Sequence, residues 1–119
     1  MKRVTMLLAA GLVVLAVASL PTIRAGAQTA GVTDDNLTQS IADAKTPADH
    51  EAIAAYYDQE AADAEKKAAL HRRAASNYKP VGMANMCEGL AKYWDKVASD
   101  AKDLAKAHRK MANAAGSGG

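Results

Sequence analysis

Two stretches of the chain, 47–78 and 83–114, place apolar residues alternately four and three positions apart. This spacing is the heptad of a helix that packs on another helix along one seam. Lys79-Pro80-Val81-Gly82 interrupts the pattern and predicts a short turn, so the two helices run antiparallel. The first seam is His50, Ala54, Tyr57, Ala61, Ala64, Ala68, His71, Ala75 and Tyr78; the second is Cys87, Ala91, Trp94, Ala98, Ala101, Ala105, His108, Ala112 and Ala115.

The sequence also marks where helices begin and end. Thr46-Pro47-Ala48-Asp49 combines a capping hydroxyl, a proline in the first turn and a carboxylate three residues after the cap. Within 28–46 we expect a shorter helix, capped by Thr33 and followed by two acidic residues. Its buried face would comprise Leu37, Ile41 and Ala44. The Gly-Ser-Gly-Gly sequence of residues 116–119 predicts a flexible tail.

Alanine fills the middle of both seams, which permits a close approach of the helices but buries little apolar area. A second apolar stripe flanks each seam and cannot be covered by a two-helix hairpin alone. We expect the short helix to cover part of it and a second copy to cover the rest, as a dimeric four-helix bundle. The stripe comprises Ile53, Tyr56, Leu70, Leu90, Tyr93, Val97, Leu104 and Met111.

The two long segments repeat each other at an offset of 37 residues. Residues 50–78 and 87–115 are identical at 11 of 29 positions, including Tyr56 with Tyr93 and Asp58 with Asp95. The pair His71-Arg72 likewise recurs as His108-Arg109. The predicted fold is therefore an all-α antiparallel hairpin, 47–115, built by internal duplication.

The first 27 residues have the pattern of a secretory signal peptide. Lys2 and Arg3 precede an apolar run over 6–20, and Ala25-Gly26-Ala27 is a cleavage signal. Cleavage there leaves 28–119 with 12 basic and 13 acidic residues, a net charge of −1. This balance argues against nucleic-acid binding. We expect a periplasmic or secreted protein without stable membrane insertion after cleavage.

The polar residues of the seams suggest two metal sites. A turn centred near Lys79 places His50 opposite His108 at the open end of the hairpin, and His71 opposite Cys87 near the turn. Met83 lies one helical turn before Cys87. Thiolate, imidazole and thioether ligands suit copper and, less well, zinc, whereas the histidine pair suits a harder ion or haem iron. Alternatively, these polar residues only specify the register of the helices.

Cys87 is the chain's single cysteine and leaves two readings open. It either crosslinks two copies or stays reduced within the seam. The aromatic residues Tyr56, Tyr57, Tyr93 and Trp94 are expected to be packing anchors rather than a ligand platform. The sequence contains no phosphate-binding loop, H-E-x-x-H or nucleophile motif, so we predict no enzymatic activity and no catalytic residues.

The pattern His-Glu…Tyr…Ala…His-Arg-x-x-Ala, over roughly 46–114, resembles small exported alanine-rich helical-hairpin proteins of bacteria. The resemblance implies an exported location and a helical-hairpin fold, and no site residue is transferred from it. The expected function is association, with itself or a partner, in the cell envelope. The alternative is a carrier or sensor of copper or haem.

Overall fold

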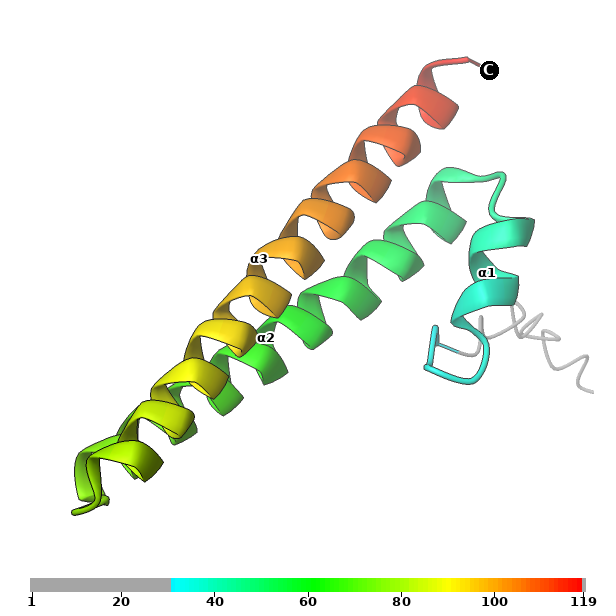
Figure 1. Ribbon diagram of the computed structural model, residues 1–119. Coiled ribbons are helices and arrows are strands. Elements are labelled where there is room, and N and C mark those ends of the chain that lie inside the picture. Colours follow the sequence, from blue (N-terminus) through cyan, green and yellow to red (C-terminus); the bar gives the residue numbers. More distant parts are fainter. Residues whose placement is uncertain (1–30, 119) are drawn as a thin grey trace, which may run out of the picture.

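The computed structural model describes residues 31–118, which form three helices: α1 (Leu37–Asp43), α2 (Pro47–Asn77) and α3 (Val81–Ser117). Helices α2 and α3 run antiparallel along most of their lengths, and α1 folds back beside the first half of α2 (Figure 1). The predicted all-α hairpin with a short leading helix is confirmed. The expected signal peptide, 1–27, lies outside the described residues.

Helix α2 begins with the capping box that its sequence predicts. The Thr46 hydroxyl accepts a hydrogen bond from the backbone N–H of Asp49 at 3.1 Å. The Asp49 carboxylate accepts in return from the backbone N–H groups of Lys45 and Thr46, at 3.0 and 2.8 Å. These donors lower the pKa of Asp49 below its ordinary value. Donors that the first helical turn leaves unpaired are thereby satisfied.

Both ends of α3 extend beyond the predicted limits of 83 and 114. The turn between α2 and α3 is only Tyr78 to Pro80, and Val81 and Gly82 already lie in the first turn of α3. The N–H groups of a first turn need no helical acceptor, so a proline just before it is well tolerated. Gly116 and Ser117 continue the helix instead of forming a tail. A Cβ atom on Gly116 would lie 3.7 Å from the Pro47 ring, so this last turn reaches the start of α2.

The seam is made of alanine, as the heptad pattern predicts. Every alanine at a predicted seam position except Ala115 is buried. His108 is buried as well, while the remaining polar and aromatic seam residues except Tyr78 are half-buried. Tyr78 and Ala115 are exposed because they lie at or beyond the ends of the helix pair. The buried alanines are Ala54, Ala61, Ala64, Ala68, Ala75, Ala91, Ala98, Ala101, Ala105 and Ala112.

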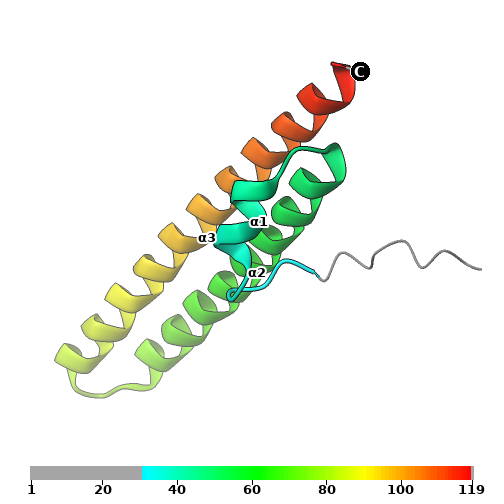
Figure 2. The ribbon, with the colours of Figure 1, turned by 90° about the vertical axis from the view of Figure 1, so that its right-hand side faces the viewer.

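Helix α1 lies in front of the hairpin in Figure 2. It packs against α2 and, among the described elements, makes no comparable contact with α3. The Tyr56 hydroxyl donates a 2.8 Å hydrogen bond to Asp34, just ahead of α1. Leu37 and Ala44 are half-buried, but Ile41 remains 42% exposed. The predicted cap at Thr33 is wrong. Asn36 occupies the cap position, and its side chain instead accepts from the backbone N–H of Thr33 in the preceding turn.

Candidate functional site

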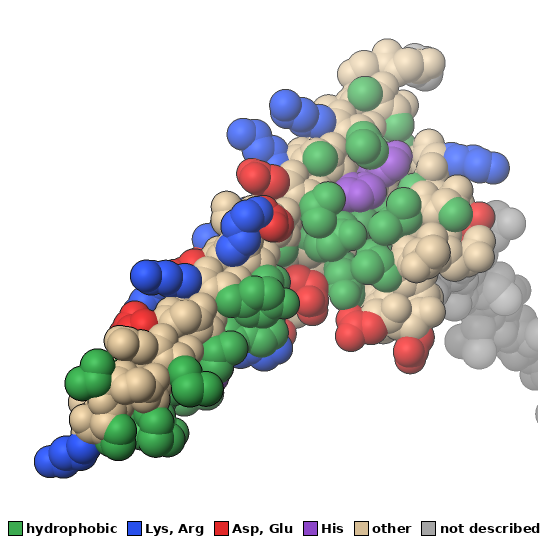
Figure 3. Space-filling view, viewed as in Figure 1, with side chains coloured by type: hydrophobic (Ala, Val, Ile, Leu, Met, Phe, Trp, Pro, Cys, Tyr) green, Lys and Arg blue, Asp and Glu red, His purple; other side chains and the backbone are tan. Residues whose placement is uncertain are grey.

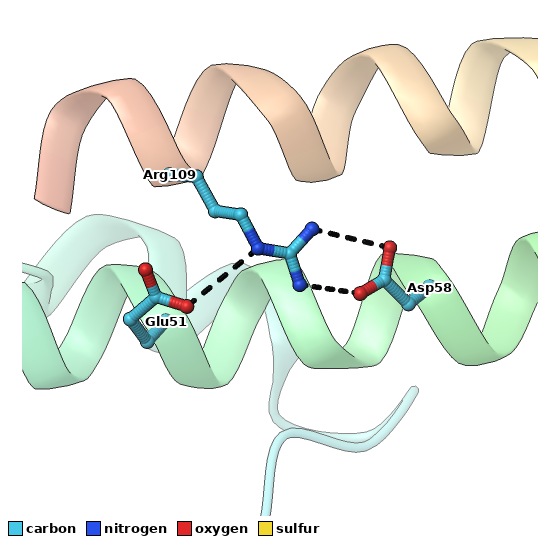
Figure 4. Close-up of polar contacts among 3 residues, drawn as sticks. All are labelled: Glu51, Asp58 and Arg109. Atoms are coloured by element: carbon cyan, nitrogen blue, oxygen red, sulfur yellow. Dashed lines mark hydrogen bonds and ion pairs between the residues drawn. The ribbon is translucent and has the colours of Figure 1, made fainter.

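One flank of the seam is closed by ion pairs between α2 and α3. Arg109 donates to both carboxylate oxygens of Asp58, at 2.5 and 3.4 Å, and its Nε lies 3.7 Å from Glu51 (Figure 4). Arg72 pairs with Asp95. Lys102 pairs with Glu65 between these two bridges. We call this row of residues the charged flank.

The charged flank follows the internal repeat. An offset of 37 residues makes Asp58 equivalent to Asp95 and Arg72 equivalent to Arg109. The bridges Asp58–Arg109 and Arg72–Asp95 are therefore related by an approximate twofold axis that exchanges α2 and α3. Glu65 and Lys102 are equivalent to each other, so their pair lies on that axis. The contacts have the symmetry that the repeat predicts.

The charged flank contains contacts that the pattern of either helix alone does not show. Asp58 and Asp95 are exposed, as that pattern predicts, but both also bridge the helices. They occupy the position directly after a half-buried seam aromatic, Tyr57 or Trp94. Opposite charges at these positions of an antiparallel pair were the available signal. The Arg109 hydrogen bond lowers the pKa of Asp58, and Asp58 raises the pKa of Arg109.

The opposite flank of the seam carries a row of apolar residues on α3. Met83, Leu90, Val97, Leu104 and Met111 follow one another at intervals of seven residues. Their side chains remain accessible: Leu90 is 45%, Leu104 43% and Met111 48% exposed. We call this row, with its α2 counterparts Ile53, Glu60 and Lys67, the apolar flank. On α2 only Ile53 is apolar among these three, and it is fully buried.

The four aromatic residues expected to be packing anchors form two pairs that the repeat makes equivalent. Tyr93 is 58% exposed in the single chain. Tyr56 and Tyr57 form an edge-to-face pair with centroids 5.3 Å apart, and Tyr93 and Trp94 form another at 5.1 Å. The Lys67 ammonium lies 4.2 Å from the Trp94 ring centroid, so its alkyl chain extends over an otherwise accessible part of the seam. Asp63 pairs with Lys66 at 3.2 Å and not with Lys67.

The open end of the hairpin holds a pair of histidines. His50 Nδ1 and His108 Nδ1 lie 3.2 Å apart, as the predicted register requires. His108 is 8% exposed, and its ring stacks on Tyr57 with centroids 6.0 Å apart. Burial, together with the neighbouring His50, lowers the pKa of His108. The tautomers of the two rings determine which Nδ1 donates this hydrogen bond and which accepts it.

The turn end is arranged differently, although the repeat makes it equivalent to the open end. His71 and Cys87 are both half-buried, and no hydrogen bond joins them in the described chain. Met83 is 46% exposed. Within residues 31–118, no three or more His, Cys, Asp or Glu side chains gather in a metal-binding arrangement. The site of His71, Cys87 and Met83 therefore stays a prediction. Cys87 is a free thiol in the single chain.

The chain matches no protein-family model, no curated protein and no solved structure. Across the described part of the chain, no helix is both long and apolar enough to cross a membrane. The functional argument therefore depends on the residues of this chain alone.

Proposed function

We propose that this chain is a small non-enzymatic helical-bundle protein of the periplasm or cell exterior, which functions by self-association. The carrying observation is the α3 row of the apolar flank, which follows the heptad period and in which Leu90, Leu104 and Met111 are exposed. A heptad row of this kind is the surface against which another helix packs. The proposed location is supported by residues 1–27, which have the sequence pattern of a secretory signal peptide.

The proposed partner is a second copy of the chain. The apolar flank runs along a helix of 37 residues, about 55 Å long, so its partner must offer an apolar row of similar length. A second α3 offers that row, and a twofold dimer would bury both rows at once. The alanine seam also favours dimerisation, because its small side chains bury little apolar area within one hairpin. Pairing two hairpins gives a four-helix bundle.

The experiment is sedimentation equilibrium of the purified chain over a wide concentration range, run both with and without reductant. We expect a dimer for the wild type, and a monomer of unchanged helix content for Leu90→Lys and Leu104→Lys. Ser99→Lys is the matched control, because Ser99 is exposed on α3 away from the apolar flank. It should remain dimeric.

Three results would reject this proposal. A wild-type monomer at every concentration excludes self-association through the apolar flank. A dimer that forms only without reductant assigns the contact to a disulfide between two Cys87 residues. Dissociation by Ser99→Lys as much as by Leu104→Lys would place the interface elsewhere.

A further inference from the structure

The histidine pair at the open end has a geometry that its role in packing does not require. A polar pair that merely specifies register can meet in many ways, and an imidazole offers two different ring nitrogens. Here the same nitrogen of both rings, Nδ1, converges on one point with a separation of 3.2 Å. Two nitrogens that bind one zinc ion tetrahedrally, at 2.0–2.1 Å each, are about 3.3 Å apart.

We propose that His50 and His108 bind one divalent transition-metal ion of the zinc type, through their Nδ1 atoms, with water completing the coordination. This proposal is independent of the self-association proposed above. Nitrogen ligands of this kind suit zinc and copper, whereas magnesium and calcium prefer oxygen. Haem is a poor fit, because its two axial imidazoles lie on opposite faces of the ring and cannot approach each other directly.

The surroundings hold the two rings ready for an ion. The Tyr57 ring stacks on His108 at an interplanar angle of 24° and thereby restricts the orientation of the imidazole. His108 is buried but His50 is only half-buried, and histidine surface is visible at the open end of the hairpin, bordered by hydrophobic side chains (Figure 3). An ion can therefore approach without unfolding the seam.

Binding changes one proton position and no charge on the protein. In the empty pair, the Nδ1 proton of one ring is shared with Nδ1 of the other. When the ion binds, the proton leaves Nδ1, and the same ring takes a proton from water at Nε2. Both rings then stay neutral, and two Nδ1 lone pairs bind the ion. Each ring has to be the neutral tautomer that carries its proton on Nε2.

The repeat supplies a matched control inside the chain. His71 is the residue equivalent to His108, but it faces the cysteine end and has no second histidine opposite. A site made by the histidine pair must therefore be lost with His50 or His108 and survive loss of His71. A site that uses any exposed imidazole or the thiol would respond to His71 or Cys87 instead.

The test is isothermal titration calorimetry of the purified chain with Zn²⁺, in reductant-free, chelator-free buffer and in a Cys87→Ser background. We expect one Zn²⁺ per chain, with affinity at least tenfold weaker in His50→Ala and unchanged in His71→Ala. His108→Ala should behave as His50→Ala, and circular dichroism verifies that each variant is folded. Half-buried His50 is the principal variant, because its replacement disturbs the seam less than that of buried His108.

A second measurement separates binding from a merely structural role of the pair. Added Zn²⁺ should raise the melting temperature of the wild type and of His71→Ala, but leave His50→Ala unchanged. The proposal is overturned if the wild type binds no Zn²⁺ at millimolar concentration. It is also overturned if His71→Ala weakens binding as much as His50→Ala, or if binding disappears with Cys87→Ser.

Discussion

The two flanks of the seam border the same alanines but contain opposite kinds of residue. The charged flank closes with ion pairs between α2 and α3, of which Asp58–Arg109 and Arg72–Asp95 are related by the approximate twofold axis. The apolar flank presents Leu90, Leu104 and Met111 to solvent on α3. Surface ion pairs stabilise a fold only weakly, whereas apolar area drives association. The charged flank therefore specifies how the helices pair, and the apolar flank indicates where more structure is to be added.

The segment that leads into α1 lies beside one part of α2 and leaves the rest of that helix uncovered. Shallow crevices between the chain ahead of α1 and α2 are lined by Ala52, Ala55 and Tyr56, so the leading segment lies along this part of α2. Ile53, at the same level, has no exposed surface. Farther along α2, Leu70 is 55% exposed. The leading segment with α1 thus covers only part of α2, and apolar side chains such as Leu70 stay exposed farther along.

The largest effect is expected where the apolar flank is already covered. Ile53→Ala removes the only large side chain that is fully buried in the described chain, which should lower the free energy of unfolding by about 2–5 kcal/mol. Leu70→Ala is the matched control on α2 and should change it by less than about 0.5 kcal/mol. Urea unfolding followed by circular dichroism measures both. Equal losses would mean that Ile53 is not buried in solution.

A smaller effect is expected on the charged flank. A double-mutant cycle with Arg72→Ala and Asp95→Ala should give a coupling of about 0.2–1 kcal/mol, because both side chains are roughly half exposed. Raising the salt concentration should reduce the coupling through screening. Urea unfolding of the four proteins is the measurement. A coupling of several kcal/mol would mean that the ion pairs, and not the apolar surfaces, stabilise the hairpin.

The seam and its register could be predicted because alanine recurs at heptad positions through the middle of both helices. A short turn then places His50 opposite His108, and their Nδ1 atoms do lie 3.2 Å apart. The ends of α3 could not be predicted as well. Gly82 and Gly116 read as helix breakers, yet both lie in terminal turns, where a glycine costs little because few helical bonds depend on it.

The ion pairs and the turn end show what single-helix patterns miss. Asp58 pairs across the seam, which is visible only when the charges of one helix are compared with those of its antiparallel partner. The repeat makes the pair His71 and Cys87 equivalent to the histidine pair, but equivalence in sequence does not bring the side chains into contact. Contact at the open end also depends on Tyr57, which stacks on His108.

The smallest expected effect concerns the bond that ties the leading segment to the apolar flank. Tyr56 donates to Asp34, and this hydrogen bond raises the pKa of Tyr56 from 10.0 to about 12. The folded chain therefore favours the protonated hydroxyl. The stabilisation is complete below pH 10.0 and is lost as the pH rises through about 12. Alkaline solution should loosen the leading segment before it affects the alanine seam.

The difference in tyrosinate absorbance between the wild type and Tyr56→Phe isolates the titration of Tyr56. A midpoint near 12, moved toward 10.0 by Asp34→Asn, would support docking of the leading segment in solution. A midpoint already at 10.0 in the wild type would mean that this segment is not held against α2. The face of α2 that carries Tyr56 would then be open to a partner helix and would belong to the association surface.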